Sequence, residues 1–246
     1  MGKVPAAEST LAVLTFLAGQ SRPVAASRIA ATLSIPRSTT YALLGVLVAA
    51  GFVIRYDAER AYGLGPAAYE LSFAYQRQAP LAIVGAKVAR KVVDQLGETC
   101  HIAVLQGRDV LYVVEQRATG RPSLVTDVGV RLPAHLTASG RALLGALPPA
   151  QLRALYAGVS TLERMGAEGS LEYSPSRVMA EAAETARRGF AVEDGEVTTG
   201  LRSHAVPVVN RAGWPIAAVA TTFEQAPAGG VEVLREAAEE LRRALA

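Results

Sequence analysis

A short cluster of hydrogen-bonding side chains, Arg37 to Tyr41, stands directly ahead of a run that carries no charge up to Ile54. Arginine can donate two hydrogen bonds to a guanine edge, and serine and threonine hydroxyls can bond to bases or phosphates. Two more arginines, Arg55 and Arg60, follow the run and suit a phosphate backbone or a narrow minor groove. The residues expected to contact DNA are therefore Arg37, Ser38, Thr39, Thr40, Tyr41, Arg55 and Arg60.

The uncharged run itself is predicted to be a helix with two different faces. Residues 37, 41 and 45 share one helical face, with 38 at its border. The opposite, buried stripe is Thr40, Leu43, Leu44 and Leu47. A membrane span is the alternative, but it needs about 18 consecutive apolar residues, and this shorter run also contains two glycines. A single helix that packs with one face and binds with the other is the better interpretation.

Three short helices and a hairpin can be placed in the first third of the chain. One helix carries Leu11, Leu14 and Leu17 on one face, and a second spans 25–33. The third begins near Ser34, taken as its N-cap, with Pro36 in the first turn. The runs 52–56 and 61–64 read as a hairpin. This order predicts a winged helix-turn-helix, the alternative being a small three-helix domain with a solvated polar face.

Charge and composition support this division. The net charge of +3 lies wholly within the first 80 residues, whereas acidic and basic residues balance in the rest. A polyanionic partner is therefore expected to bind the first third of the chain. Half of the chain is apolar, which suits a globular protein. The single Cys100 excludes an intrachain disulfide and fits a reducing compartment, so a cytoplasmic location is expected.

The remaining two thirds alternate between helical and strand patterns. Residues 66–79 form a connecting helix, and another helix spans 81–96. Strands are expected at 101–106, 110–116, 201–209 and 215–223, with helices after residue 140, over 175–188 and from about Val231. Hairpins covered by separate helices predict an α+β domain. The expected domains are a winged helix-turn-helix over 1–66, a linker helix over 67–80 and a sensor domain over 81–246.

Three segments, in this order, resemble the IclR-type (isocitrate lyase regulator) family of bacterial transcription factors. They are RIAATLSIPRSTTYALLGVLVAAGFV, GVRLPAHLTASGRALLGALP and RRGFAVEDGEVTTGLRSHAVPVVNRAGWPIAAVATT. The resemblance implies a DNA-binding winged helix-turn-helix, a linker helix used in dimerisation and a GAF-like effector domain, in a dimer or tetramer on operator DNA. The chain departs from the family pattern at Ser34, where glycine is common, at Ala42, where a second arginine is common, and at Ser203, where some members have cysteine.

The resemblance also implies an effector pocket, at Leu132, Ala138, Ser139, Asp194, Ser203 and Thr222. Residues 137–139 open a helix, whose N–H groups and dipole suit a carboxylate. The sequences of these segments are similar to those of family members that sense aromatic acids, so a small organic acid, which could be aromatic, is the expected effector. Alternatives stay open: Ser139 as a helix cap, Asp194 as a turn residue, and Ser203 and Thr222 facing solvent, since a one-residue shift of register flips a strand.

The sequence leaves two alternatives to a ligand-responsive DNA-binding regulator. A small-molecule sensor whose helical module binds a protein would share most of these patterns. An enzyme would need catalytic motifs, and the chain lacks GxSxG, HExxH, P-loop and dinucleotide-binding patterns. We therefore expect no catalytic activity, cofactor or metal.

Overall fold

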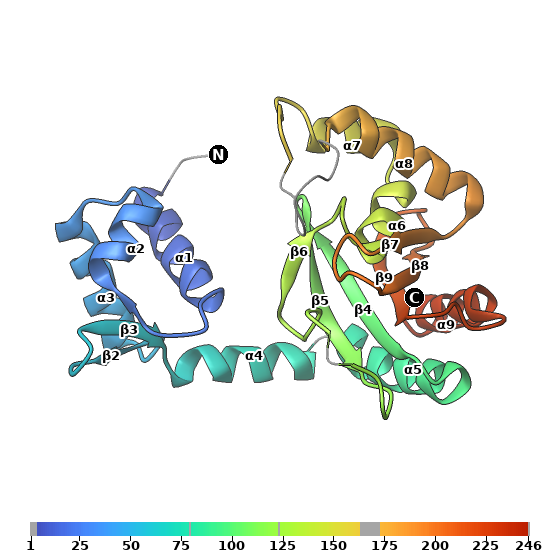
Figure 1. Ribbon diagram of the computed structural model, residues 1–246. Coiled ribbons are helices and arrows are strands. Elements are labelled where there is room, and N and C mark those ends of the chain that lie inside the picture. Colours follow the sequence, from blue (N-terminus) through green and yellow to red (C-terminus); the bar gives the residue numbers. More distant parts are fainter. Residues whose placement is uncertain (1–3, 79, 123, 163–172, 246) are drawn as a thin grey trace. The chain divides into compact units, whose positions relative to one another are not determined.

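The computed structural model describes residues 4–78, 80–122, 124–162 and 173–245. The chain divides into two compact units, Met1–Gln78 and Ala79–Ala246 (Figure 1). The connecting helix α4 spans Pro66–Gln78 and belongs to the first unit, where it packs against the hairpin. The three predicted domain ranges, 1–66, 67–80 and 81–246, stay a prediction.

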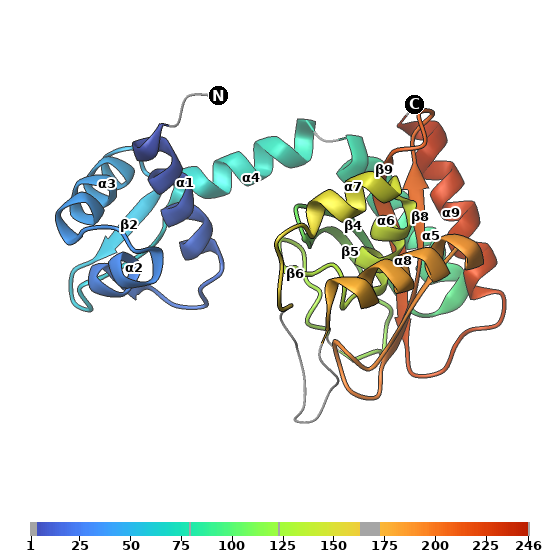
Figure 2. The ribbon, with the colours of Figure 1, turned by 90° about the horizontal axis from the view of Figure 1, so that it is seen from above.

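The first unit is a winged helix-turn-helix, as predicted. Its helices are α1 (Pro5–Ala18), α2 (Ala26–Leu33) and α3 (Arg37–Ala49), and its strands are β1 (Val24–Ala25), β2 (Val53–Tyr56) and β3 (Ala61–Leu64). The strands form an antiparallel sheet in the order β1-β3-β2, beside the three helices (Figure 2). The core includes Val13, Ile29, Leu44 and Val53. The short strand β1 was not predicted.

The turn between α2 and α3 differs from the prediction. Ser34 has a φ of 54° and caps the C-terminus of α2, with its N–H donating to Ala31 O at 3.3 Å. The N-cap of α3 is Pro36. The assignment of Ser34 as an N-cap was therefore wrong, because a left-handed residue ends one helix rather than beginning the next. Glycine is the usual residue at such a C-cap.

Replacing Ser34 with glycine is expected to stabilise the first unit by about 0.5 to 1 kcal/mol. The left-handed conformation costs a residue with a Cβ about 1–2 kcal/mol, and glycine offsets part of this gain through the entropy of its unfolded chain. Urea unfolding would measure the change. The matched control is Ser38→Gly in the first turn of α3, which has helical backbone and should instead lose about 0.5 kcal/mol; a destabilised Ser34→Gly variant would contradict the expectation.

The second unit is built on one antiparallel sheet of six strands in the order β6-β5-β4-β9-β8-β7. The four predicted strands are present. Two short edge strands, β6 and β7, were not predicted. The bounds are β4 (Thr99–Gln106), β5 (Asp109–Gln116), β6 (Arg131–Pro133), β7 (Ala191–Asp194), β8 (Arg202–Val209) and β9 (Pro215–Phe223).

Helices cover both faces of this sheet (Figure 1). One face carries α5 (Pro80–Leu96) and α9 (Gly230–Ala244), and the other carries α6 (Ala138–Ala146), α7 (Pro149–Leu155) and α8 (Pro175–Arg188). Alternate residues of β4 serve the two sides: Cys100 and Ile102 belong to the α5/α9 core, and Ala103 to the α6/α8 core. Two apolar cores on one sheet confirm the predicted α+β class.

No helix in the described part of the chain combines the length and apolar character that a membrane crossing requires. The uncharged run from Tyr41 to Ile54 instead forms most of α3 and the start of β2. Leu44 and Leu47 are buried on one side of α3, as the periodicity predicted, and Leu43 is half-buried.

Candidate functional site

The N-terminal end of α3 presents hydrogen-bonding side chains to solvent. Arg37, Ser38, Thr39 and Tyr41 are all exposed, and Tyr41 has 58% of its surface accessible. On the opposite side, Leu44 and Leu47 fix the helix in the core. The helix therefore has the two faces that the sequence predicted, with the polar one at the end that a recognition helix inserts into a major groove.

Thr40 does not share this exposed face. Its surface is 0% accessible and its Oγ1 donates to the Pro36 carbonyl oxygen at 3.1 Å. The expected DNA contact by Thr40 is thus contradicted: the residue lies one step around the helix from Tyr41, on the stripe that packs inward.

The hairpin carries the two other arginines in exposed positions. Arg60 lies in the turn between β2 and β3 with a φ of 47°. Arg55 on β2 forms an ion pair with Asp57, with Nε and Oδ1 2.8 Å apart, and both side chains are exposed. An exposed pair contributes little free energy, so Arg55 can exchange this partner for a phosphate.

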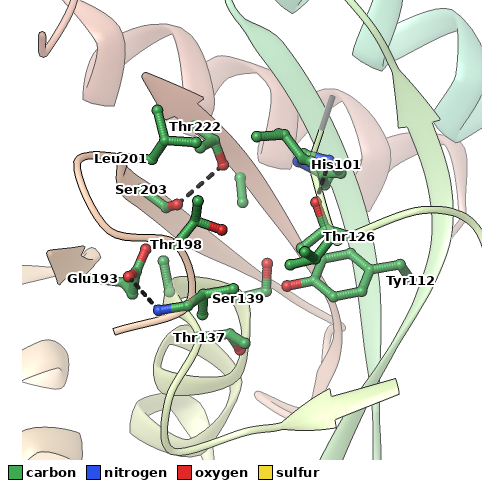
Figure 3. Close-up of a pocket in the computed structure, with 15 residues that line it drawn as sticks. His101, Tyr112, Thr126, Thr137, Ser139, Glu193, Thr198, Leu201, Ser203 and Thr222 are labelled. Atoms are coloured by element: carbon green, nitrogen blue, oxygen red, sulfur yellow. Dashed lines mark hydrogen bonds between the residues drawn. The ribbon is translucent and has the colours of Figure 1, made fainter. Parts of the chain in front are cut away.

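In the second unit, a row of polar side chains crosses the α6 face of the sheet. Glu193 on β7, Ser203 on β8 and Thr222 on β9 are consecutive register partners. Ser203 and Thr222 share a hydrogen bond of 3.0 Å, and Glu193 Oε1 accepts one from the Val197 backbone N–H at 3.0 Å (Figure 3). Partners directly opposite in an antiparallel sheet point to the same face. The row therefore forms one wall of a pocket.

The N-terminus of α6 forms the facing wall. Thr137 is its N-cap, and the Thr137 Oγ1 accepts a hydrogen bond from the Gly140 N–H at 2.9 Å. Ala138 and Ser139 line the pocket. Ser139 is 1% exposed, and its hydroxyl lies at the Tyr112 hydroxyl, an interaction that lowers the pKa of Tyr112 against the larger effect of burial. Thr137 rather than Ser139 is therefore the cap, and the hydroxyls of Ser139 and Tyr112 line the pocket beside the first N–H groups of the helix.

A third wall comes from the other half of the sheet. His101 Nε2 on β4 and Thr126 Oγ1 share a hydrogen bond of 2.8 Å, and the Tyr112 ring on β5 packs edge-on against His101. Burial raises the pKa of Tyr112 to about 12, so its hydroxyl keeps its proton. Tyr112 extends toward the α6 side of the pocket (Figure 3).

Four of the six predicted effector residues line this pocket: Ala138, Ser139, Ser203 and Thr222. Asp194 does not, because its side chain is exposed and pairs with Arg202 at 2.8 Å on the other face of β7. The acidic residue in the pocket is its neighbour Glu193, which is buried. Leu132 is also misplaced: it lies in the core between the sheet and α6.

Several residues that line the pocket were not predicted from the sequence. His101, Tyr112, Thr126 and Glu193 join the pocket together with Leu124, Val125, Thr137, Val197, Thr198, Leu201 and Ala220. The register of β4 and β5 shifts at a bulge between Ile102 and Ala103, which pairs Tyr112 with Ala103. Simple alternation along the two strands therefore could not predict that His101 and Tyr112 share a face. No sequence signal was available for the loop residues.

The pocket as described is nearly closed. Its volume is about 20 Å³, close to what one water molecule needs. The walls at Leu124–Thr126 and Val197–Leu201 are loops, so a larger ligand requires these two segments to move apart. In the described ranges, no three His, Cys, Asp or Glu side chains are grouped as metal ligands.

A buried arginine fixes the walls to one another. Arg141 on α6 is 8% exposed. Its guanidinium donates to His135 O at 2.9 Å, Val192 O at 2.8 Å, Tyr173 Oη at 2.5 Å and Glu196 Oε1 at 2.8 Å. Glu196 Oε2 in turn accepts from the Asp194 N–H at 2.7 Å. Arg141 thus joins the helix that opens the pocket to the β7–β8 loop that carries Val197 and Leu201.

The fold and these two sites define a class of protein: a DNA-binding winged helix-turn-helix joined to an α+β domain with a small-molecule pocket. Comparison with known families agrees. The model of the IclR helix-turn-helix domain matches residues 6–56, and the model described as bacterial transcriptional regulator IclR C-terminal matches residues 73–245. The chain belongs to the IclR family of bacterial transcriptional regulators, which favours DNA over a protein as the partner of the first unit.

Similar proteins include the Pca regulon regulatory protein of Pseudomonas putida, 32% identical over 85% of this chain and 70% of that protein. The transcriptional repressor IclR of Escherichia coli K12 is 26% identical over 89% and 79%. Among solved structures, an IclR-type regulator from Silicibacter sp. TM1040 has a TM-score of 0.82 at 25% identity, covering 97% of this chain and 95% of that one. An IclR homologue from Microbacterium hydrocarbonoxydans, solved with 4-hydroxybenzoate, has a TM-score of 0.76 at 24% identity and covers 98% of each.

Proposed function

We propose that this regulator responds to a small organic acid, of aromatic type, held in the pocket between α6 and the sheet. The observation that carries the proposal is the N-terminus of α6, which faces the pocket with the buried hydroxyls of Ser139 and Tyr112 beside it. Helix N–H groups and the helix dipole favour a carboxylate there. Leu124, Val125 and Leu201 supply an apolar surface for the body of the ligand.

Glu193 is compatible with an acidic ligand. Burial raises the pKa of its carboxyl group, which favours the neutral form and lowers the repulsion of a carboxylate nearby. The structural neighbour solved with 4-hydroxybenzoate and the relative named for the Pca regulon support an aromatic acid.

For DNA, the proposed contacts are Arg37, Ser38, Thr39 and Tyr41 on α3 and Arg55 and Arg60 on the hairpin. We propose that the protein acts in the cytoplasm as a homodimer or tetramer, with α4 contributing to dimerisation. Tyr69 and Leu71 on α4 are largely exposed, which suits an interface. A symmetric dimer would place two recognition helices on half-sites about one helical turn apart. The effector acts by binding one arrangement of the protein better than another.

Replacing Ser203 with phenylalanine is expected to abolish the effector response and leave DNA binding intact. The larger side chain fills the pocket and removes the hydroxyl that bonds to Thr222, while the DNA-binding unit is untouched. Thermal shift with 4-hydroxybenzoate would measure binding, because a ligand that prefers the folded state raises the melting temperature. A gel shift in the presence of the acid would measure the response.

The matched control is Ser176→Phe, which adds the same bulk at an exposed position of α8. It should keep both the thermal shift and the response. A Ser203→Phe protein that still responds to the acid would place the effector elsewhere.

A further inference from the structure

A second small cavity adjoins the proposed effector pocket. The two share Leu124, Leu201 and Thr222 as walls, and Leu201 and Thr222 lie together at this boundary (Figure 3). The second cavity adds Glu98 and Arg121 to these shared walls. A ligand that extends past Thr222 would therefore enter it.

The polar row on the sheet leads into this cavity. Thr222 on β9 is the register partner of Ser203 on one side and of Thr99 on the other. Thr99 lines the second cavity, and Glu98 precedes it in the chain. The floor is thus continuous from the effector pocket to Glu98.

Glu98 has one carboxylate oxygen in use and one without a partner. The residue is 4% exposed, and its Oε1 accepts a hydrogen bond from Arg121 Nη2 at 2.5 Å. Its Oε2 is buried and has no hydrogen-bond partner among the described residues. Burial raises the pKa of Glu98. A buried acceptor without a donor is costly, and a ligand that supplies the donor recovers that cost.

The charges around the cavity select the kind of group that fits. Glu98 and Glu224 line it with negative charge, and Arg121 is the single cation among the described lining residues. Arg121 is already engaged, since its Nε donates to Gly97 O at 3.1 Å. The excess of negative charge disfavours a second carboxylate and favours a donor.

We propose that this cavity is a subsite for a hydrogen-bond donor on the end of the effector opposite its carboxylate, with Glu98 Oε2 as the acceptor. The inference rests on the proposed function and narrows its ligand to hydroxy- or amino-substituted acids. Glu98 is then a specificity-determining residue.

Calorimetric titration of the full-length protein with benzoate, 4-hydroxybenzoate and terephthalate tests this directly. The 4-hydroxy compound should bind at least about tenfold more tightly than benzoate, the value of one hydrogen bond to a charged group. Terephthalate, with a second carboxylate in the donor's place, should bind more weakly than benzoate. Equal affinities for benzoate and the 4-hydroxy compound would overturn the subsite and leave the acid pocket standing. If none of the three binds, the proposed function fails, and the subsite with it.

Glu98→Gln supplies the residue-level test. Arg121 keeps the side-chain oxygen of the glutamine engaged, so the amide N–H donors take the place of the Oε2 acceptor. The affinity advantage of 4-hydroxybenzoate over benzoate should then fall to less than about threefold. The matched control is Glu236→Gln, an exposed carboxylate on α9 that does not line the cavity and should keep the advantage. If Glu98→Gln weakens both ligands equally, the subsite is overturned. The ligand series on the unmodified protein stays decisive even if the variant folds poorly.

Discussion

Replacing Arg37 with alanine is expected to weaken operator binding by about 10- to 100-fold, or more if the guanidinium bonds to both acceptors of a guanine. Arg37 is exposed at the N-terminal end of α3, and its removal leaves the buried stripe of Leu44 and Leu47 in place. The loss should therefore be in DNA affinity rather than in stability. A gel shift at moderate salt measures it, with a duplex that the unmodified protein selects from a random pool.

Two comparison variants sharpen this experiment. Arg37→Lys keeps the charge but not the planar fork, so intermediate binding with relaxed sequence preference would indicate base contact, and unchanged preference would indicate a phosphate contact. Arg153→Ala removes an exposed arginine from α7 in the second unit and should leave DNA binding unchanged. Retention of full affinity by Arg37→Ala would show that α3 does not read the operator through this residue.

Arg141→Leu is expected to destabilise the second unit by about 3 to 5 kcal/mol. Removing one partner of a buried charge network leaves the other charges unpaired, which is the costly case. Here Glu196 loses its cation and Glu181 keeps only Arg177, while the carbonyl oxygens of His135 and Val192 lose a donor. Burial by itself would lower the pKa of Arg141, but the surrounding negative groups raise it, so the guanidinium stays charged. Urea unfolding monitored for the second unit measures the change.

The control for Arg141 is Arg177→Leu on α8. Arg177 pairs with the same Glu181 at 3.0 Å but is more than a third exposed, so its loss should cost at most about 1 kcal/mol. Arg141→Lys should fall between the two, since an ammonium keeps the charge and loses the fork. A change of less than about 1 kcal/mol for Arg141→Leu would show that the network adds little to stability.

The DNA-binding unit was predicted largely from local patterns. Helical periodicity in α3 separates Arg37 and Tyr41 from Leu44 and Leu47, and this depends only on residues within a few turns of one another. The error at Ser34 also has a local cause: serine is a common N-cap and an unusual residue in the left-handed region that ends a helix, so its type indicated the wrong role and only the backbone angle corrects it.

The proposed effector pocket was only partly predictable, because its walls come from β4, β5, β7, β8, β9 and the start of α6. The misplacement of Asp194 shows the limit. A strand of only four residues, β7, gives too little alternation to fix its faces, and a shift of one residue exchanges Asp194 for Glu193. Pairing with β8 decides the matter, since it sets Glu193 opposite Ser203.

The sequence by itself determined the two-faced recognition helix, the hairpin and the order of the longer helices and strands, since these follow from short-range periodicity and turn residues. Only the tertiary structure decided which polar groups meet. The row Glu193, Ser203, Thr222 and Thr99 joins the consecutive strands β7, β8 and β9 to the distant strand β4. Arg141 likewise joins α6 to Tyr173 and to the segment that holds Val192 and Glu196. Strand register and helix packing set those neighbours, and they depend on the whole buried core rather than on any local stretch.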